Sequence, residues 1–102
     1  MLVDCHVNVY EDAQILPLHL EVTRFARADA VELPSNPDIV ERAMADVDKA
    51  IVFSLRYHDS LGIDGNDEVT AEAVRRYPDK FVGLAAVDPR RPDCMELLRH
   101  AI

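Results

Sequence analysis

The chain of 102 residues lacks the hallmarks of several protein classes. It has only three glycines, so it contains neither a glycine-rich phosphate loop nor a GxSxG nucleophile elbow. Its 11 Lys and Arg are outnumbered by 19 Asp and Glu, which gives a net charge of −8 and no basic surface for nucleic acid or an anionic membrane. No apolar run approaches the roughly 18 residues that a membrane-spanning helix needs.

Signals of secretion and of disulfide pairing are also missing. No basic segment precedes the first apolar stretch, and Asp4 lies inside that stretch, so we do not interpret it as a signal peptide. Cys5 and Cys94 are far apart and show no CxxC spacing, which predicts two free thiols. We therefore expect a cytoplasmic protein that binds neither nucleic acid nor membrane.

The composition that remains, 49% hydrophobic and 29% charged, is that of one small globular domain. Residues 2–9 alternate between apolar and polar side chains, which favours a strand. Residues 50–55 and 81–87 are almost continuously apolar, which is typical of strands buried on both faces of a parallel sheet. The sequence therefore predicts three strands.

Helix signals follow each strand at some distance. Asn36 and Pro37 predict the start of a helix that runs to about residue 46, after an irregular excursion at about 11–35 that contains one helix over 21–30. Asn66 predicts the cap of a second helix, which Pro78 ends. Asp93 predicts the cap of a third.

This alternation of strands and helices predicts an α/β fold with a parallel sheet and right-handed crossovers. A closed eight-stranded barrel needs about 200 residues or more, so the chain is too short for one. The third helix still carries apolar residues up to Ile102. We therefore expect the first part of a doubly wound sheet or of a barrel, incomplete at this end.

Chemically useful residues stand where the predicted strands end, which is where parallel α/β folds bind ligands. His6 and Asn8, two apart in a strand, point to one side together with Asp4, and imidazole is a common zinc ligand. Arg56 could hold a carboxylate, and His58 could act as an acid or base. Each group also has a purely structural interpretation: a hydrogen-bonded histidine and a solvated loop.

The order of several segments resembles the amidohydrolase superfamily. Residues 2–8, LVDCHVN, are similar to its first-strand D-x-H-x-H segment, and residues 47–54, VDKAIVFS, resemble the second-strand G-V-D-K-A-V-V of the amidohydrolase-related branch. Asn66-Asp67 and the stretch RYPDKFVGLAAVDP at 76–89 resemble the N-D and Y-P-D-R-F-x-G-x-A-x-V-x-P signature of that branch. The branch includes aminocarboxymuconate-semialdehyde decarboxylase and the resorcylate-type decarboxylases.

The resemblance implies the first three βα units of a (β/α)₈ barrel that binds one divalent metal, usually zinc. His6 matches the first histidine of the strand-one pair. Asn8 stands where the second is expected, which makes it a weak ligand or a group that supports the ligands, because an amide binds zinc less strongly than imidazole. Arg56 and His58, which are candidates because of their position after a predicted strand, would contact the substrate in such an enzyme. The other metal ligands and the catalytic aspartate come from later strands, so no catalytic residue lies within this chain.

Two functions follow as hypotheses. The first is the N-terminal portion of a metal-dependent hydrolase or decarboxylase that acts on a small carboxylate, amide or ester, with the chain inactive by itself. The second is a stand-alone, non-catalytic α/β module that forms homo-oligomers, because apolar edge strands favour pairing with another copy.

Overall fold

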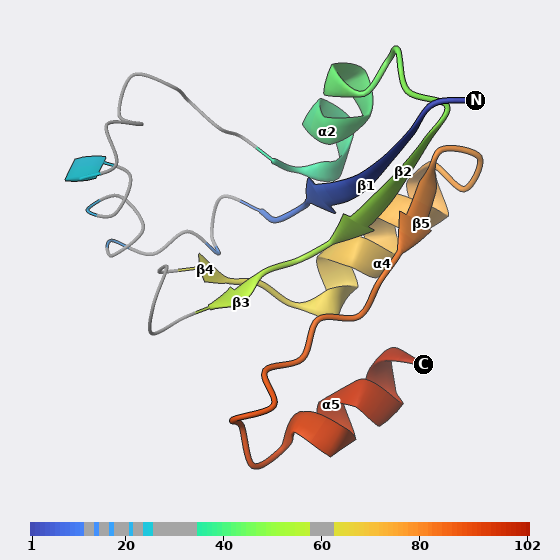
Figure 1. Cartoon of the computed structure of the whole chain (residues 1–102). Coiled ribbons are helices and arrows are strands. Elements are labelled where there is room, and N and C mark those ends of the chain that lie inside the picture. Colours follow the sequence, from blue (N-terminus) through green and yellow to red (C-terminus); the bar gives the residue numbers. More distant parts are fainter. Residues whose placement is uncertain (12–13, 15–16, 18–20, 22–23, 26–34, 58–62) are drawn as a thin grey trace.

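The computed structural model describes residues 1–11, 14, 17, 21, 24–25, 35–57 and 63–102. Among these residues the chain forms a small α/β fold around a three-stranded sheet (Figure 1). The helix predicted over 21–30 lies for the most part outside the described residues. The elements are β1 (Val3–Asn8), α2 (Pro37–Ala43), β2 (Lys49–Phe53), β3 (Arg56–Tyr57), β4 (Ile63–Asp64), α4 (Asp67–Arg76), β5 (Phe81–Gly83) and α5 (Cys94–Ala101).

The main sheet has the order β1-β2-β5 with both pairs parallel, which confirms the predicted α/β fold with a parallel sheet. Val7 lies opposite Val52, and Ala50 lies opposite Phe81. β5 is only three residues long, whereas the apolar run predicts a strand over 81–87. β5 has one neighbour, so its hydrogen-bonded ladder ends where β2 stops supplying partners, and the backbone N–H of Leu84 donates the last bond to Val52 O.

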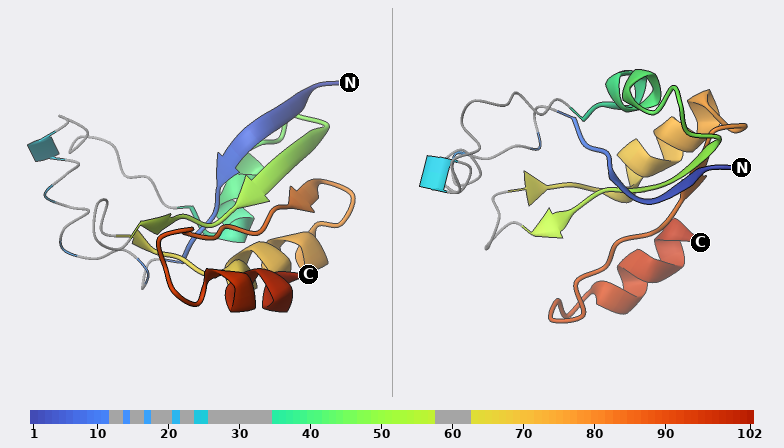
Figure 2. Two further views of the ribbon diagram at one scale, coloured as in Figure 1. Left: turned by 60° about the horizontal axis from the view of Figure 1, so that its bottom comes forward. Right: turned by 45° about the horizontal axis from the view of Figure 1, so that its top comes forward.

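Asparagine caps begin the two helices that pack on the sheet, as the sequence predicts. The side chain of Asn36 accepts a hydrogen bond from the Ile39 N–H at 3.1 Å, and that of Asn66 accepts one from the Val69 N–H at 3.3 Å. α2 is shorter than predicted: it ends at Ala43 and continues as turns to residue 46. α2 and α4 lie on the same side of the sheet (Figure 2), and buried residues of both helices belong to the core cluster on that side, here called the covered face.

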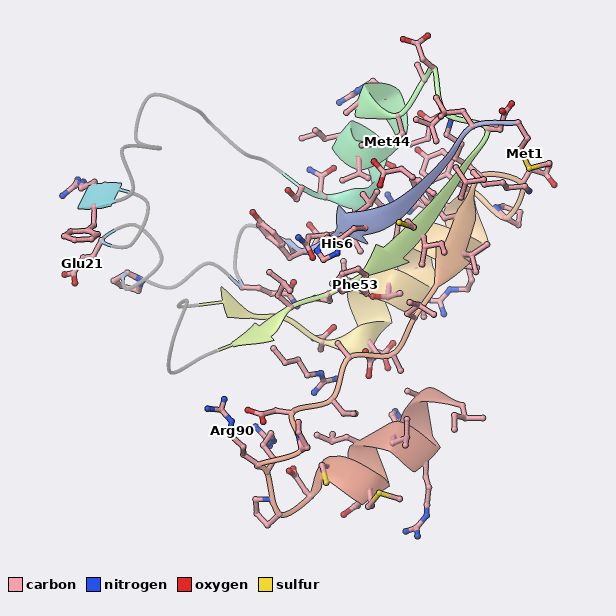
Figure 3. All side chains as sticks on the ribbon, in the orientation of Figure 1. Met1, His6, Glu21, Met44, Phe53 and Arg90 are labelled. Atoms are coloured by element: carbon pink, nitrogen blue, oxygen red, sulfur yellow. The ribbon has the colours of Figure 1, made fainter. Side chains whose placement is uncertain are left out.

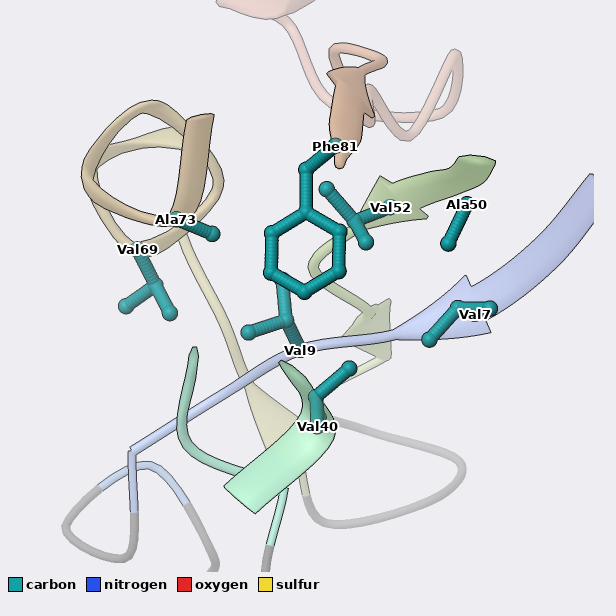
Figure 4. Close-up of a cluster of buried hydrophobic side chains, with 8 residues drawn as sticks. All are labelled: Val7, Val9, Val40, Ala50, Val52, Val69, Ala73 and Phe81. Carbon is teal, nitrogen blue, oxygen red and sulfur yellow. The ribbon is translucent and has the colours of Figure 1, made fainter. Parts of the chain in front are cut away.

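The core lies between the covered face and the two helices (Figure 4). Val9, Ala50, Val52 and Ala73 are completely buried, and Phe81 is 2% exposed. The Phe81 ring meets the edge of Tyr77, with the ring centres 5.6 Å apart. The whole cluster consists of Val7, Val9, Val40, Ala50, Val52, Val69, Ala73 and Phe81.

The opposite side of the sheet, here called the open face, is apolar but exposed. It carries the residues that alternate with the core residues, and Val3, Val82 and Leu84 on it are 46%, 50% and 50% exposed. Ile51 and Phe53 of β2 lie on the same side and are half-buried. The two faces of one sheet therefore differ sharply in burial.

Two features depart from the predicted elements. Residues predicted as a loop between Arg56 and Gly65 contain a two-residue antiparallel pair, β3 with β4. Asp93 is the N-cap residue of α5, as predicted, but its carboxylate binds the Arg91 guanidinium at 2.8 Å and makes no capping hydrogen bond to a helix N–H. α5 has no buried residue and lies beside α4, where His100 is 3.9 Å from Glu68.

In the part of the chain that is described, no helix is long and apolar enough to cross a membrane.

Candidate functional site

The carboxyl ends of β1, β2 and β5 meet at one edge of the main sheet, because all three strands run in the same direction. β1 ends at Asn8, β2 at Phe53 and β5 at Gly83. His6, Asn8 and Arg56, three of the four predicted site residues, lie at or just beyond this edge. The fourth, His58, lies outside the described residues.

His6 is exposed and packs against β2. Its ring meets the edge of the Phe53 ring, with centres 5.0 Å apart and planes at 79°, and Figure 3 shows the two labelled side by side. The His6 backbone N–H donates to the Asp4 carboxylate at 3.0 Å. His6 is therefore an exposed residue whose imidazole packs against an aromatic neighbour on the open face.

A β-bulge separates Asp4 from His6. The register pairs Asp4 with Ala50 and Val7 with Val52, so β1 has one residue more than β2 between these two positions. The alternation expected to bring Asp4, His6 and Asn8 to one side is therefore interrupted after Asp4. The Asp4 carboxylate accepts a hydrogen bond from the His6 backbone N–H within the same strand. It therefore does not lie beside the His6 and Asn8 side chains.

Asn8 lies opposite Phe53, next to His6 at the end of β1. Its Oδ1 is buried and accepts no hydrogen bond from any described residue. A buried carbonyl oxygen without a donor is unfavourable. It is therefore an acceptor that a ligand, a cation or a donor from elsewhere in the protein could satisfy.

These residues do not by themselves fit the zinc site that the resemblance implies. A catalytic zinc ion takes three protein ligands, and the described part of the chain holds no group of three or more His, Cys, Asp or Glu placed to bind a metal. His6 supplies one imidazole, and Asn8 supplies one amide oxygen. Further ligands would have to come from outside the described residues.

Arg56 is the first residue of β3, three positions after the end of β2, and forms a half-buried ion pair. Its Nη2 lies 3.0 Å from Asp67 Oδ2, and the two side chains are 19% and 18% exposed. One N–H of the guanidinium, that of Nε, is therefore buried without an acceptor among the described residues.

A pocket of about 560 Å³, here called the carboxyl-edge pocket, lies at the ends of β2 and β5. Its walls are mainly apolar and include Phe53, Leu84 and Val87. Arg56, Asp88 and Arg90 supply its charges. Such a mixture, an apolar body with a few charged groups, is typical of a site for a small organic molecule.

Asp88 and Arg90 form the outer rim of this pocket. Hydrogen bonds from the Arg90 side chain and backbone N–H lower the pKa of Asp88 to about 2, so the carboxylate stays ionised at neutral pH. In the sequence, residues 88–91 follow the third predicted strand, where a ligand could bind, but their composition favours a purely structural turn. The structure shows that Asp88, Pro89 and Arg90 of this segment line the pocket.

Asp67 stands out in the sequence only as part of the N-D match and is not among the predicted site residues. Its carboxylate accepts hydrogen bonds from Arg56 Nη2 at 3.0 Å and from the Ala86 N–H at 3.1 Å. Its partners are 11 and 19 residues away, so no local pattern indicates them.

The fold and this edge define an α/β protein whose candidate site residues gather where three parallel strands end. Comparison of the chain with protein-family models, with curated proteins and with solved structures found no significant match.

Proposed function

We propose that the chain forms the N-terminal part of a metal-dependent hydrolase or decarboxylase of the amidohydrolase type, acting on a small carboxylate, amide or ester. One observation carries this proposal: His6, Asn8 and Arg56 stand at the shared carboxyl edge of three parallel strands, beside an apolar pocket. Enzymes built on parallel α/β sheets place their chemistry at this edge.

The two faces of the sheet support a barrel as the complete fold. In a (β/α)₈ barrel, helices cover the outer face of the sheet, and the inner face is filled by side chains from the other strands. α2 and α4 pack on the covered face, while Val82 and Leu84 on the open face are each 50% exposed. The open face thus corresponds to the inside of the proposed barrel.

The residues of this chain would bind and orient the substrate. The guanidinium of Arg56 can hold a carboxylate through two N–H groups, and the apolar walls of the pocket exclude water from the rest of the ligand. His6 stands on the same face with its imidazole exposed, where it can serve as one metal ligand. The groups that carry out the reaction belong to later strands in this proposal.

Elemental analysis tests the metal, and it is done on the complete enzyme of this proposal, which includes the later strands, isolated without chelators. We expect about one divalent ion per molecule of that enzyme, lost in His6→Ala and retained more firmly in Asn8→His, because the second substitution adds an imidazole beside the first. Asp79→Asn, an exposed position remote from this edge, is the matched control. A protein without bound metal, whose turnover is unchanged after chelation, would contradict the proposal.

A second candidate, the non-catalytic module that forms homo-oligomers, is favoured by one observation. β1 and β5 are both edge strands, and the open face beside them exposes apolar side chains. The 102-residue chain is then expected to elute as a defined oligomer and to unfold in one cooperative transition. Aggregation of the same chain, without a defined oligomer, argues for the first candidate.

A further inference from the structure

Asp67, the first residue of α4, binds two segments that are otherwise separate. Its Oδ2 accepts from Arg56 Nη2 at 3.0 Å, and its Oδ1 accepts from the Ala86 backbone N–H at 3.1 Å. Both partners line the carboxyl-edge pocket, whereas Asp67 is absent from its lining. One carboxylate therefore holds two walls of a pocket that it does not itself touch.

The Arg56 wall depends on this carboxylate for its orientation. The arginine follows β2 and has 19% of its side chain exposed, and Asp67 is its ionic partner among the described residues. A guanidinium that is mostly withdrawn from water needs an anion beside it. With Nη2 bound to Asp67, the planar group is fixed, and its Nε, which finds no acceptor among the described residues, is fixed with it.

The second wall, residues 84–88, continues β5 after its ladder ends. The Leu84 N–H donates to Val52 O at 2.9 Å, and the next hydrogen bond from this segment to another element is that of Ala86 to Asp67. Beyond the last hydrogen bond of the sheet, Asp67 thus accepts the next hydrogen bond from this segment. The same carboxylate binds Arg56 after β2, so one side chain contacts the segments that follow both strands.

We propose that Asp67 is the positioning residue of the carboxyl-edge pocket, setting the place of the Arg56 guanidinium and of the Ala86 peptide relative to each other. The inference rests on the proposed function where it treats Arg56 as a substrate contact. The hydrogen bonds from Asp67 to Arg56 and to Ala86 do not depend on any proposed ligand. Ligand affinity therefore depends on a residue that makes no contact with the ligand.

Two substitutions separate the two bonds of Asp67. Asp67→Asn keeps an oxygen that can accept the Ala86 N–H but removes the charge that holds Arg56, whereas Asp67→Ala removes both. We expect a changed Arg56 Nε–H signal in the nitrogen–proton NMR spectrum of both variants. We expect the Ala86 amide to exchange at least about tenfold faster only in Asp67→Ala. General destabilisation would not produce this division.

Glu68→Gln is the matched control, since it removes a carboxylate from the same helical turn. Glu68 is 73% exposed, and its Oε1 lies 3.9 Å from Nε2 of His100 in α5. This variant should leave the Arg56 and Ala86 signals as they are. Equal responses in Glu68→Gln and Asp67→Ala, or no response in Asp67→Ala, would overturn the inference.

Titration with benzoate links this arrangement to binding and keeps the two proposals distinguishable. We expect its dissociation constant to rise roughly tenfold in Asp67→Asn and also in Arg56→Lys, because either change loses the fixed guanidinium. The Ala86 amide should stay protected in Arg56→Lys, since Asp67 still accepts its hydrogen. Unchanged benzoate binding in Arg56→Lys would refute the role of Arg56 in the proposed function, while the NMR result would still decide the role of Asp67.

Discussion

The two faces of the central sheet are made from the same three strands but are built differently. On the covered face Ala50 and Val52 are completely buried, whereas on the open face Val82 and Leu84 are half-exposed. The residues with candidate chemistry, His6 among them, belong to the open face or to the edge beside it. The buried core of the described residues therefore lies on the covered face, whereas the open face keeps apolar side chains partly exposed.

The largest expected effect is that of Phe81→Ala on the covered face. Phe81 is 2% exposed at the centre of the core, so its loss should lower the free energy of unfolding by about 3–5 kcal/mol. Phe53→Ala, the same change on the open face, is the control and should cost less than about 2 kcal/mol. Denaturant unfolding measures both. Equal losses would show that the open face is as well packed as the covered one.

A second substitution tests the close packing of Gly65 against the segment that follows β2. A Cβ on Gly65 would lie 2.1 Å from Ser54 Oγ and 2.2 Å from the backbone oxygen of Leu55. The backbone would have to shift, so Gly65→Ala should cost about 1–3 kcal/mol. Gly83→Ala is the control, because the added Cβ meets only the methyl groups of Thr70 and Val74, at 3.0 Å, and side chains can move. A greater loss of stability in Gly83→Ala would contradict the steric explanation.

The outer side of the helices that make the covered face should respond to pH. Hydrogen bonds from the Tyr77 hydroxyl and the Arg76 guanidinium lower the pKa of Asp38 below its ordinary value of 3.8. A lowered pKa in the folded state stabilises the fold above pH 3.8, and this stabilisation is lost as the pH falls through the folded pKa. Asp38→Asn should therefore reduce Tm at neutral pH, and the difference from the unaltered protein should shrink on acidification.

Asp79→Asn is the control for this pH dependence. Asp79 is exposed, and its carboxylate makes no hydrogen bond or ion pair with another described residue. Its Tm should follow that of the unaltered protein across the whole pH range. A constant Tm difference for Asp38→Asn down to the most acidic conditions would refute the linkage.

Signals within a few residues predicted much of the covered face correctly. Asn36 and Asn66 cap their helices because a cap needs only the next turn of the chain, and the apolar run at 50–55 became β2 because its side chains can be buried on either face. β5 was predicted too long because a strand extends only as far as its neighbour pairs with it. The Asp93 side chain makes no capping hydrogen bond because Arg91, two residues away, competes for the carboxylate.

The candidate site was less predictable because its geometry depends on distant partners. His6, Asn8 and Arg56 were placed at the carboxyl edge by strand order alone, and they lie there. The bulge that removes Asp4 from their side is visible only in the pairing of β1 with β2. The role of Asp67 is not predicted from the sequence, because its partners Arg56 and Ala86 are 11 and 19 residues away.

The smallest expected effect is the sharpest test of the comparison between the faces. Val82→Thr replaces one methyl group by a hydroxyl on a side chain that is 50% exposed, so water can satisfy the new group, and stability should change by less than about 0.5 kcal/mol. Val52→Thr makes the same change on the neighbouring strand, where the residue is completely buried, and should cost about 1–3 kcal/mol because the hydroxyl loses its water. The two variants share size, shape and strand propensity, so only burial distinguishes them. If Val82→Thr costs as much as Val52→Thr, the open face is covered in solution. A second measurement of Val82→Thr at high dilution then shows whether another copy of the chain covers it, because the cost would fall as the copies separate.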